Sequence, residues 1–256
     1  MDILTRLKAL GRPDALPHMA RYGIDTSNAF GVKVPDLRVL AREIGVDHRL
    51  ALALWKSGVH DARLLATMIA DPAKLDMRAA ERWARDLRSW DLCDQCCLNL
   101  YRRLSFTHDL VGRWGERDEK FVRRAAFSLI AVLAVHEKTA GDARLLAYLP
   151  LIEVASDDPR LMVRKSVNWA LRQIGKRNAA LNAAVIEAGL RIAAHGSLAC
   201  WVASDALREL RSPQVQARLR SRPAAAPAPA RPSSQSLSRP RSARRPPRKP
   251  APRSRG

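Results

Sequence analysis

The chain has 256 residues, 47% of them hydrophobic, and a formal net charge of +20. This length can bury a substantial core, and the charge makes a polyanion the natural partner, with nucleic acid favoured over a membrane surface. A membrane-spanning helix is not expected, because the longest apolar run, residues 125–135 broken only by Ser128, is too short to span a bilayer.

The chain reads as helix after helix, because β-branched residues never alternate with polar ones over a useful length. Glycines follow or separate the apolar-periodic runs, as expected at helix ends. One longer irregular segment, 22–34, is a candidate packing or binding loop. The sequence predicts helices over 2–10, 14–21, 35–43, 47–57, 60–70, 76–87, 90–103, 106–114, 118–136, 142–155, 159–175, 179–195 and 198–211.

The predicted helix 90–103 places an aromatic residue beside an acid. Ser89 is a good N-cap residue, and Asp91 lies in the first turn, where a carboxylate offsets the positive helix end. Asp94 follows Trp90 by four residues, so the indole and the carboxylate share one helix surface. Such a pair suits a ligand that is cationic or becomes so. The alternative is a core indole and a solvated or capping acid.

The later helices repeat with a period near 40 residues. Residues 118–125 align with 159–166, which takes Val122 onto Val163, and a further lag of about 39 residues reaches Val202. This period is typical of HEAT-type solenoids, in which one helix of each pair lines a concave face. The alternative is an irregular helical bundle. We therefore predict an all-α, HEAT-like solenoid with a concave basic face over residues 1–220.

The repeat also predicts which side chains share a row. Arg124 and Ser128 lie one turn apart, and the lag places Trp169 beside them in the stack. Trp201 and Asp205 form a second Trp-x-x-x-Asp pair, with Trp201 a candidate core residue of the last repeat. This second pair shows that the spacing alone is not specific.

The tail, residues 221–256, holds ten of the 45 basic residues and no acidic one. The first 220 residues therefore carry 35 basic and 25 acidic residues and are still basic. Rich in Pro, Ala and Arg, the tail lacks the large apolar residues that offset chain entropy, so we expect it to be disordered. It either attracts phosphates without specificity or only improves solubility.

The cysteines do not form a disulfide framework, since three of the four crowd at Cys93, Cys96 and Cys97. We therefore expect a cytoplasmic, nucleoid-associated protein. The C-x-x-C spacing could indicate a metal site. No second pair follows, however, and Cys200 stands alone, so buried, unreactive cysteines are favoured. The histidines show no ligand spacing, and we expect them to be solitary.

One chemistry uses an indole, an acid and an arginine together. A purine alkylated on a ring nitrogen is cationic, and breaking its glycosidic bond moves positive charge onto the sugar. A carboxylate stabilises that charge and orients water. Indole faces favour the cation, and an arginine holds the neighbouring phosphate. Trp90, Asp94, Arg124 and Trp169 supply these parts if the solenoid brings them together.

Four stretches of the chain resemble one family, the HEAT-like bacterial DNA alkylation repair glycosylases of the AlkD type. The stretches are Phe30–Arg38, Ser89–Asp94, Phe121–Ala125 and Val163–Arg172, within a resemblance that covers about Tyr22 to Leu210.

The resemblance implies roles for individual residues. It makes Trp90 and Trp169 the site indoles, Asp94 the catalytic carboxylate, and Arg124 the arginine that grips DNA, with Arg123 its uncertain neighbour. It also implies that the protein removes cationic N3- and N7-alkylated bases from duplex DNA, that it acts from the backbone side of the DNA, and that it uses no metal or cofactor. The basic tail is outside the family pattern, and other site aromatics of the family cannot be placed here.

Basic side chains on the predicted inner helices either line a groove for the duplex or form a solvated helix face, and we favour the groove. They are Lys120, Arg123, Arg124, Arg164, Lys165, Arg172 and Lys176. Two functions follow. The first is a monomeric DNA glycosylase for alkylated purines in duplex DNA, with no membrane or small-molecule partner. The second is a non-catalytic HEAT scaffold that recognises DNA shape or another protein.

Overall fold

In residues 2–194 and 197–221, which the computed structural model describes, every regular element is a helix. The α-helices are α1 (Ile3–Ala9), α2 (Leu16–Arg21), α3 (Val34–Ile44), α4 (His48–Lys56), α5 (His60–Ile69), α6 (Met77–Arg85), α7 (Trp90–Asn99), α8 (Thr107–Gly115), α9 (Lys120–His136), α10 (Asp142–Leu146), α11 (Leu149–Ala155), α12 (Leu161–Gly175), α13 (Ala179–Ala193), α14 (Ser197–Leu210) and α15 (Pro213–Arg220). Short 3₁₀ turns are η1 (Pro13–Ala15), η2 (Pro72–Lys74) and η3 (Tyr101–Arg103). These helices lie in one unit, Met1–Ala225. The predicted tail lies outside the described residues, apart from Ser221.

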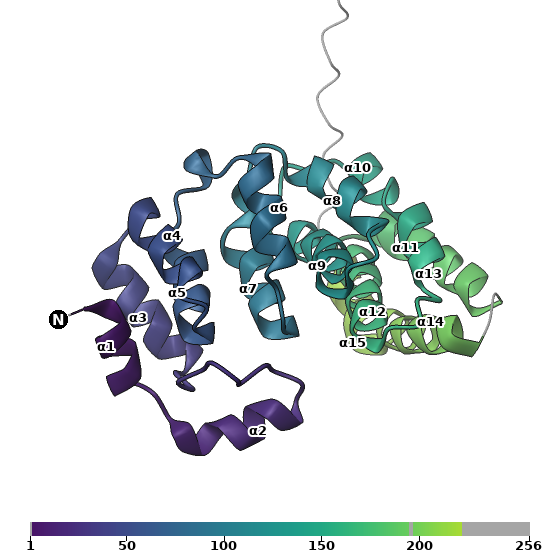
Figure 1. Ribbon diagram of the computed structural model, residues 1–256. Coiled ribbons are helices and arrows are strands. Elements are labelled where there is room, and N and C mark those ends of the chain that lie inside the picture. Colours follow the sequence, from purple (N-terminus) through teal and green to yellow (C-terminus); the bar gives the residue numbers. More distant parts are fainter. Residues whose placement is uncertain (1, 195–196, 222–256) are drawn as a thin grey trace, which may run out of the picture. The chain divides into compact units, whose positions relative to one another are not determined.

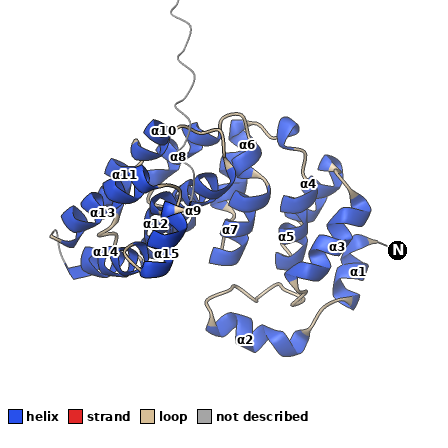
Figure 2. Cartoon of the chain, turned by 180° about the vertical axis from the view of Figure 1, so that it is seen from behind, coloured by secondary structure: helices blue, strands red, loops and turns tan. Residues whose placement is uncertain are grey.

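The helices of this unit form an inner and an outer row, as Figures 1 and 2 show from opposite sides. In the inner row α3 packs on α5, α5 on α7, α7 on α9, α9 on α12 and α12 on α14. The outer row covers it, with α4 on α5, α8 on α9, α11 on α12 and α13 on α14. Stacked helix pairs of this kind confirm the predicted HEAT-like solenoid. None of the helices in the described ranges is long and apolar enough to cross a membrane.

The repeat register is confirmed by burial. Val122, Val163 and Val202 occupy equivalent places on α9, α12 and α14, and all three are buried. Helix α9 is the centre of the stack, because it packs against α7, α8 and α12. This position explains why the most apolar run of the sequence falls on it, with residues 124–134 buried throughout.

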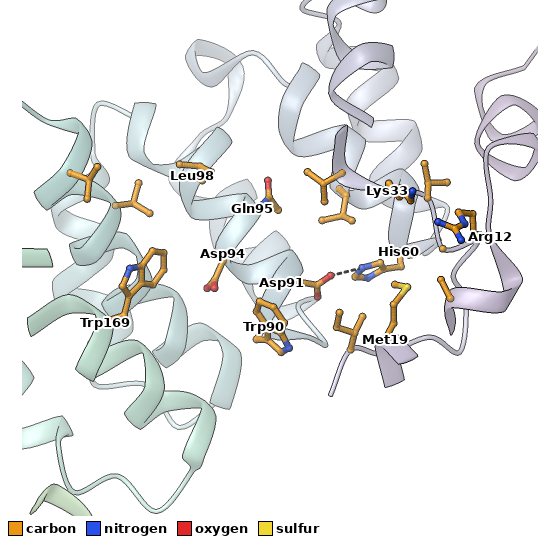
Figure 3. A pocket seen from close by; sticks show the side chains of 18 of the residues that line it. Arg12, Met19, Lys33, His60, Trp90, Asp91, Asp94, Gln95, Leu98 and Trp169 are labelled. Atoms are coloured by element: carbon orange, nitrogen blue, oxygen red, sulfur yellow. Dashed lines mark hydrogen bonds and ion pairs between the residues drawn. The ribbon is translucent and has the colours of Figure 1, made fainter. Parts of the chain in front are cut away.

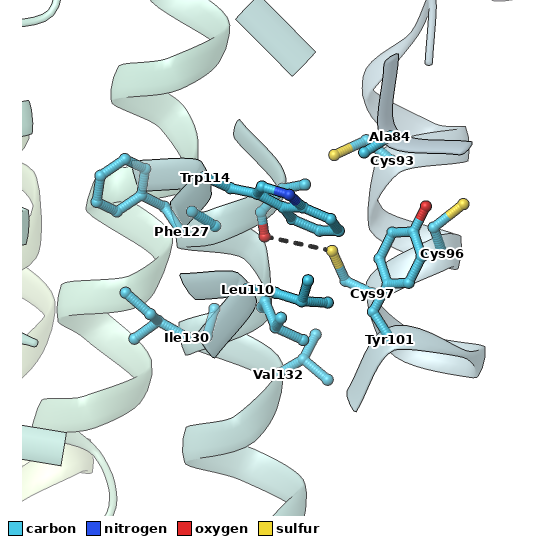
Figure 4. Close-up of a cluster of buried hydrophobic side chains, with 14 of the residues drawn as sticks. Ala84, Cys93, Cys96, Cys97, Tyr101, Leu110, Trp114, Phe127, Ile130 and Val132 are labelled. Carbon is cyan, nitrogen blue, oxygen red and sulfur yellow. Dashed lines mark hydrogen bonds between the residues drawn. The ribbon is translucent and has the colours of Figure 1, made fainter. Parts of the chain in front are cut away.

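The three crowded cysteines are part of the core, as predicted (Figure 4). The Cys97 thiol donates to the Ala125 carbonyl at 3.4 Å, which ties α7 to α9. Burial among apolar side chains raises the pKa of Cys96 and Cys97 well above the usual thiol value. These thiols are therefore protonated and unreactive in the folded protein. Cys200 is exposed.

Three helix predictions were wrong in detail. Helix α7 ends at Asn99, and the chain continues through the 3₁₀ turn η3 where one helix over 90–103 was expected. The predicted helix 142–155 is two helices, because Pro150 lacks the N–H that would continue α10 and instead occupies the first turn of α11. Helix α15 was missed, although it begins with a recognisable signal: the Ser212 hydroxyl accepts from the backbone N–H of Val215, with proline in the first turn.

Candidate functional site

The Asp94 carboxylate is held by two side chains of the neighbouring inner helix. It projects from α7 toward α9, where Ser128 Oγ donates to Oδ1 at 2.8 Å. The Arg124 guanidinium binds it from one turn earlier on α9, with Nη2 at 3.1 Å from Oδ1 and 2.9 Å from Oδ2, and Nε at 3.2 Å from Oδ1. The repeat register explains this geometry, since Arg124 and Ser128 share one face of α9.

Two opposing influences act on the Asp94 carboxyl group. Burial is the larger and raises its pKa above the ordinary aspartate value, while the charge and hydrogen bonds of Arg124 and the Ser128 hydroxyl oppose it. The Asp94 side chain is 20% exposed to solvent, and the Arg124 side chain is 6% exposed. The hydrogen bonds from Arg124 and Ser128 fix the Asp94 carboxyl group in one orientation, and it is still reachable from one side.

Arg124 has a second anchor. Its Nη1 donates to the carbonyl of Met162 on α12 at 2.6 Å, so the guanidinium joins α7, α9 and α12. A guanidinium carries five N–H donors, and these contacts leave at least one Nη1 hydrogen for another acceptor. Arg124 thus lines the smaller cavity with hydrogen-bonding capacity left over while it holds Asp94.

The two predicted indoles flank this carboxylate. In the view of Figure 3, Asp94 lies between Trp90 of α7 and Trp169 of α12. The Trp90 Nε1 donates to the carbonyl of Tyr22 at 2.9 Å, which fixes the ring. A cavity of about 290 Å³ is lined by Tyr22, Trp90, Asp94, Arg124, Met162, Lys165 and Trp169. The structure thus brings together the four side chains that the sequence singled out, and their roles stay predictions.

A larger cavity of about 630 Å³ shares Trp90, Asp94 and Trp169 with the smaller one. It continues along the inner row toward α5 and residues 12–34, and most of its walls are apolar side chains (Figure 3). Its polar wall includes an ion pair that the sequence analysis missed: His60 Nε2 lies 2.8 Å from Asp91 Oδ2. The prediction that the histidines are solitary was therefore wrong for His60.

The two members of this pair hold each other in the charged form. Burial lowers the pKa of His60, but the hydrogen bond and charge of Asp91 outweigh burial and raise it above the ordinary histidine value. Burial raises the pKa of Asp91, but the contact with His60 outweighs burial and lowers it. The pair joins the N-terminal ends of α5 and α7 at the edge of the larger cavity.

The irregular segment 22–34 is pinned to α5 by a buried carboxylate. Asp61 accepts from the backbone N–H groups of Phe30 at 2.6 Å and Val32 at 2.7 Å, and it is fully buried. Gly31 lies between them with φ +80°, and a Cβ there would approach the Arg12 carbonyl oxygen to 2.6 Å. Only glycine fits that position. The predicted binding loop is thus a fixed wall of the larger cavity.

Several predicted DNA-binding residues are already bound to acids of the chain. Arg123 lies 3.4 Å from the buried Asp158 carboxylate, which also binds Arg160, and Arg164 donates to the Asp158 carbonyl. Arg172 and Lys176 share Glu209 at 2.7 and 2.8 Å. Each of these carboxylates is shared by two cations and offsets one positive charge, and the Arg164 contact is to a backbone carbonyl, so these side chains are held in place but only partly neutralised.

Two of the three lysines of the predicted groove differ from these paired residues. Lys120 and Lys165 are exposed, and Lys165 lines the smaller cavity beside Arg124.

Two other expectations were wrong. Ser89 is fully buried, and its side chain makes no capping hydrogen bond to α7, so the residue type is right but the cap is not formed. Trp201 is not a core residue, since 42% of it is exposed. Its partner Asp205 pairs with Arg208, and neither Trp201 nor Asp205 lines the cavities beside Asp94. The second Trp-x-x-x-Asp pair is thus separate from the site.

Comparison with known proteins agrees with this architecture. A solved structure described as a new family of proteins related to the HEAT-like repeat DNA glycosylases, with affinity for branched DNA structures, superposes with a TM-score of 0.68. It is 19% identical and covers 74% of this chain and 83% of its own, so the likeness concerns the fold. A designed armadillo repeat protein in complex with the peptide (KR)4 gives a TM-score of 0.34 at 14% identity, over 80% of this chain and 96% of its own. No curated protein matches the sequence.

The family comparison covers most of the solenoid. The family model described as DNA alkylation repair enzyme matches residues 3–210, which contain both cavities, Asp94 and the Trp90, Arg124 and Trp169 side chains around it. This match identifies the helical repeats as those of a DNA repair protein, and the superposition agrees with it on the fold. The chain belongs to the DNA alkylation repair enzyme family.

Proposed function

We propose that this protein is a DNA glycosylase that removes cationic N3- and N7-alkylated purines from duplex DNA by hydrolysing the N-glycosidic bond. The observation that carries the proposal is the Asp94 carboxylate, held by Arg124 and Ser128 at the wall of a cavity that also has two indoles. Membership of the DNA alkylation repair enzyme family supports it.

Asp94 supplies the negative charge that the reaction needs. As the bond between sugar and base breaks, positive charge develops on the sugar ring, and the electron pair leaves with the base, whose alkylation already makes it a good leaving group. A carboxylate fixed beforehand stabilises this charge without reorganising. Asp94 also orients a water molecule toward the sugar carbon, and the carboxylate accepts a proton from that water as the new bond forms.

Arg124 has two tasks in this scheme. Its contact with Asp94 opposes the effect of burial and favours the ionised carboxyl, and in this scheme its remaining Nη1 hydrogen donates to the phosphate of the damaged nucleotide. Lys165 lines the same cavity and adds a second positive charge for that phosphate. The nucleotide is thereby held by its backbone, with its sugar toward Asp94.

Trp90 and Trp169 provide the selectivity for a cation. An indole face near a positive charge contributes roughly 0.5–2 kcal/mol. Both rings line the cavity around Asp94, so the cationic nucleotide and the developing charge on the sugar meet aromatic surface. An unmodified purine lacks the charge and gains less from these rings.

The test is release of free base from a duplex treated with a methylating agent, measured by chromatography. The wild type should release 7-methylguanine or 3-methyladenine, and Asp94→Asn should release neither while it still binds DNA, because asparagine keeps an acceptor for Ser128. Asp205→Asn is the matched control, since it changes the same residue type at the same spacing from a tryptophan outside the cavities and should retain activity. A wild-type protein that releases no base would contradict the proposal.

The competing function is a non-catalytic scaffold that binds distorted or branched DNA. The one observation in its favour is the superposed structure, which is described as having affinity for branched DNA. It predicts that the wild type binds branched DNA and releases no base from methylated duplex, so the same assay separates the two functions.

A further inference from the structure

A second basic site lies on the inner row, outside the two cavities around Asp94. A depression of about 340 Å³ is lined by Arg38 and Arg42 of α3, Met68 of α5, Asn99 of α7, and Arg102 and Arg103 of η3. We call these four arginines the arginine cluster. The remaining lining residue is Ala41, so no carboxylate lines the depression.

The charges of the arginine cluster are not neutralised by the protein. Within the described part of the chain, none of the four arginines forms an ion pair, and Arg38, Arg42 and Arg103 are exposed. This contrasts with Arg172 and Lys176, which share Glu209. Four like charges around one hollow repel one another, so an anion that enters it is favoured.

The position of the cluster relative to Asp94 follows from two helices. On α7, Leu98 lines the larger cavity and Asn99 lines the depression. On α5, Leu64 lines the larger cavity and Met68, one turn later, lines the depression. One helical turn is about 5.4 Å, and one nucleotide advances a DNA strand by about 3.4 Å along the axis. Asn99 follows Asp94 by five residues on α7, so the depression begins about 7–8 Å from Asp94 along that helix, a distance of the order of a few nucleotide steps.

We propose that the arginine cluster binds phosphates of the duplex that flank the damaged nucleotide, as a second anchor separate from Arg124. The inference rests on the proposed action on duplex DNA. Forked guanidinium groups suit phosphate oxygens, and such contacts position the duplex without reading its sequence. In this proposal α3 and η3 add backbone contacts to those predicted from the basic residues of α9 and α12.

The test is the salt dependence of binding to a short undamaged duplex, measured by fluorescence anisotropy with the full chain. Arg38→Gln/Arg103→Gln removes one charge from each side of the depression. Each lost phosphate contact lowers the slope of log K against log salt by about 0.9, so the slope should fall by about 2 and binding near physiological salt should weaken roughly ten- to thirtyfold.

Two variants control this measurement. Arg172→Gln/Lys176→Gln removes the same number of charges from cations already bound to Glu209 and should change the slope less than half as much. Arg38→Lys/Arg103→Lys keeps the charge and should restore most of the slope. A cluster variant with the wild-type slope, or an equal loss in the Arg172 and Lys176 control, overturns the inference.

The proposed function has its own readout in the same proteins. Base release from methylated duplex by the wild type, measured beside the salt series, tests the glycosylase proposal independently of the cluster variants. If the slopes of the wild type and the cluster variant differ as expected but the wild type releases no base, the glycosylase proposal fails and the inference about the arginine cluster stands.

Discussion

The contact between Asp94 and Arg124 predicts a large energetic coupling between α7 and α9. Truncating one partner of a buried ion pair costs about 3–5 kcal/mol, because the other charge is left without compensation. Asp94 keeps 20% of its exposure, so water takes over part of the contact. We expect Asp94→Ala to lower the free energy of unfolding by about 2–3 kcal/mol. Arg124→Ala should cost about 2–4 kcal/mol, since it also loses the Met162 carbonyl contact and the buried stem.

The double variant isolates the pair. If the two side chains act mainly through each other, Asp94→Ala/Arg124→Ala should cost less than the sum of the single variants by about 1–3 kcal/mol. Urea unfolding followed by circular dichroism gives all four free energies. The exposed pair Asp205 and Arg208 is the control, with an expected coupling below about 1 kcal/mol. A coupling at the Asp94 pair no larger than at this control would refute the geometry on which the site depends.

Three further predictions concern other parts of the fold. The His60–Asp91 pair should stabilise the protein most between the ordinary pKa values of 3.8 for Asp91 and 6.5 for His60. Because the folded protein raises the pKa of His60, the stabilisation by the pair is lost as the pH rises through the pKa of His60 in the folded protein. Because it lowers the pKa of Asp91, the stabilisation is also lost as the pH falls through the pKa of Asp91 in the folded protein. The stability difference between wild type and His60→Gln should therefore be largest near pH 5, at about 1–3 kcal/mol, and a difference independent of pH would contradict it. Gly31→Ala should lower the free energy of unfolding by about 1–3 kcal/mol, because φ is positive and the Arg12 carbonyl blocks a Cβ; a neutral effect in urea unfolding would be the contrary result. A thiol reagent should modify Cys200 in the native protein and all four cysteines after unfolding, and fast native reaction at Cys97 would show that its burial is wrong.

The sequence predicted the solenoid because its strongest features are local or periodic. Apolar spacing and glycine stops gave the helices, and the lag near 40 residues gave the stacking order that puts Trp169 beside Arg124 and Ser128. Two signals in the sequence were not used in this prediction, proline at position 150 and Ser-Pro at 212–213. Both mark the start of a helix, and using them would have split 142–155 and added α15.

The electrostatic contacts were harder to predict, because they join residues whose spacing has no pattern of its own. His60 and Asp91 lie 31 residues apart, and Asp61 reaches back to the backbone of Phe30 and Val32. The same limit applies to the predicted basic groove on α9 and α12. Counting charges on α9 and α12 could not show that Asp158 binds Arg123 or that Arg172 and Lys176 share Glu209.

The central claim is that Asp94 stabilises positive charge on the sugar of a damaged nucleotide. The most direct measurement compares binding of two duplexes, one with a neutral ring ether at the abasic position and one with a protonated ring amine that mimics the charged sugar. The wild type should bind the cationic duplex much more tightly, and Asp94→Asn should lose that preference without losing affinity for the neutral duplex. Equal affinity of the wild type for both duplexes would contradict the claim.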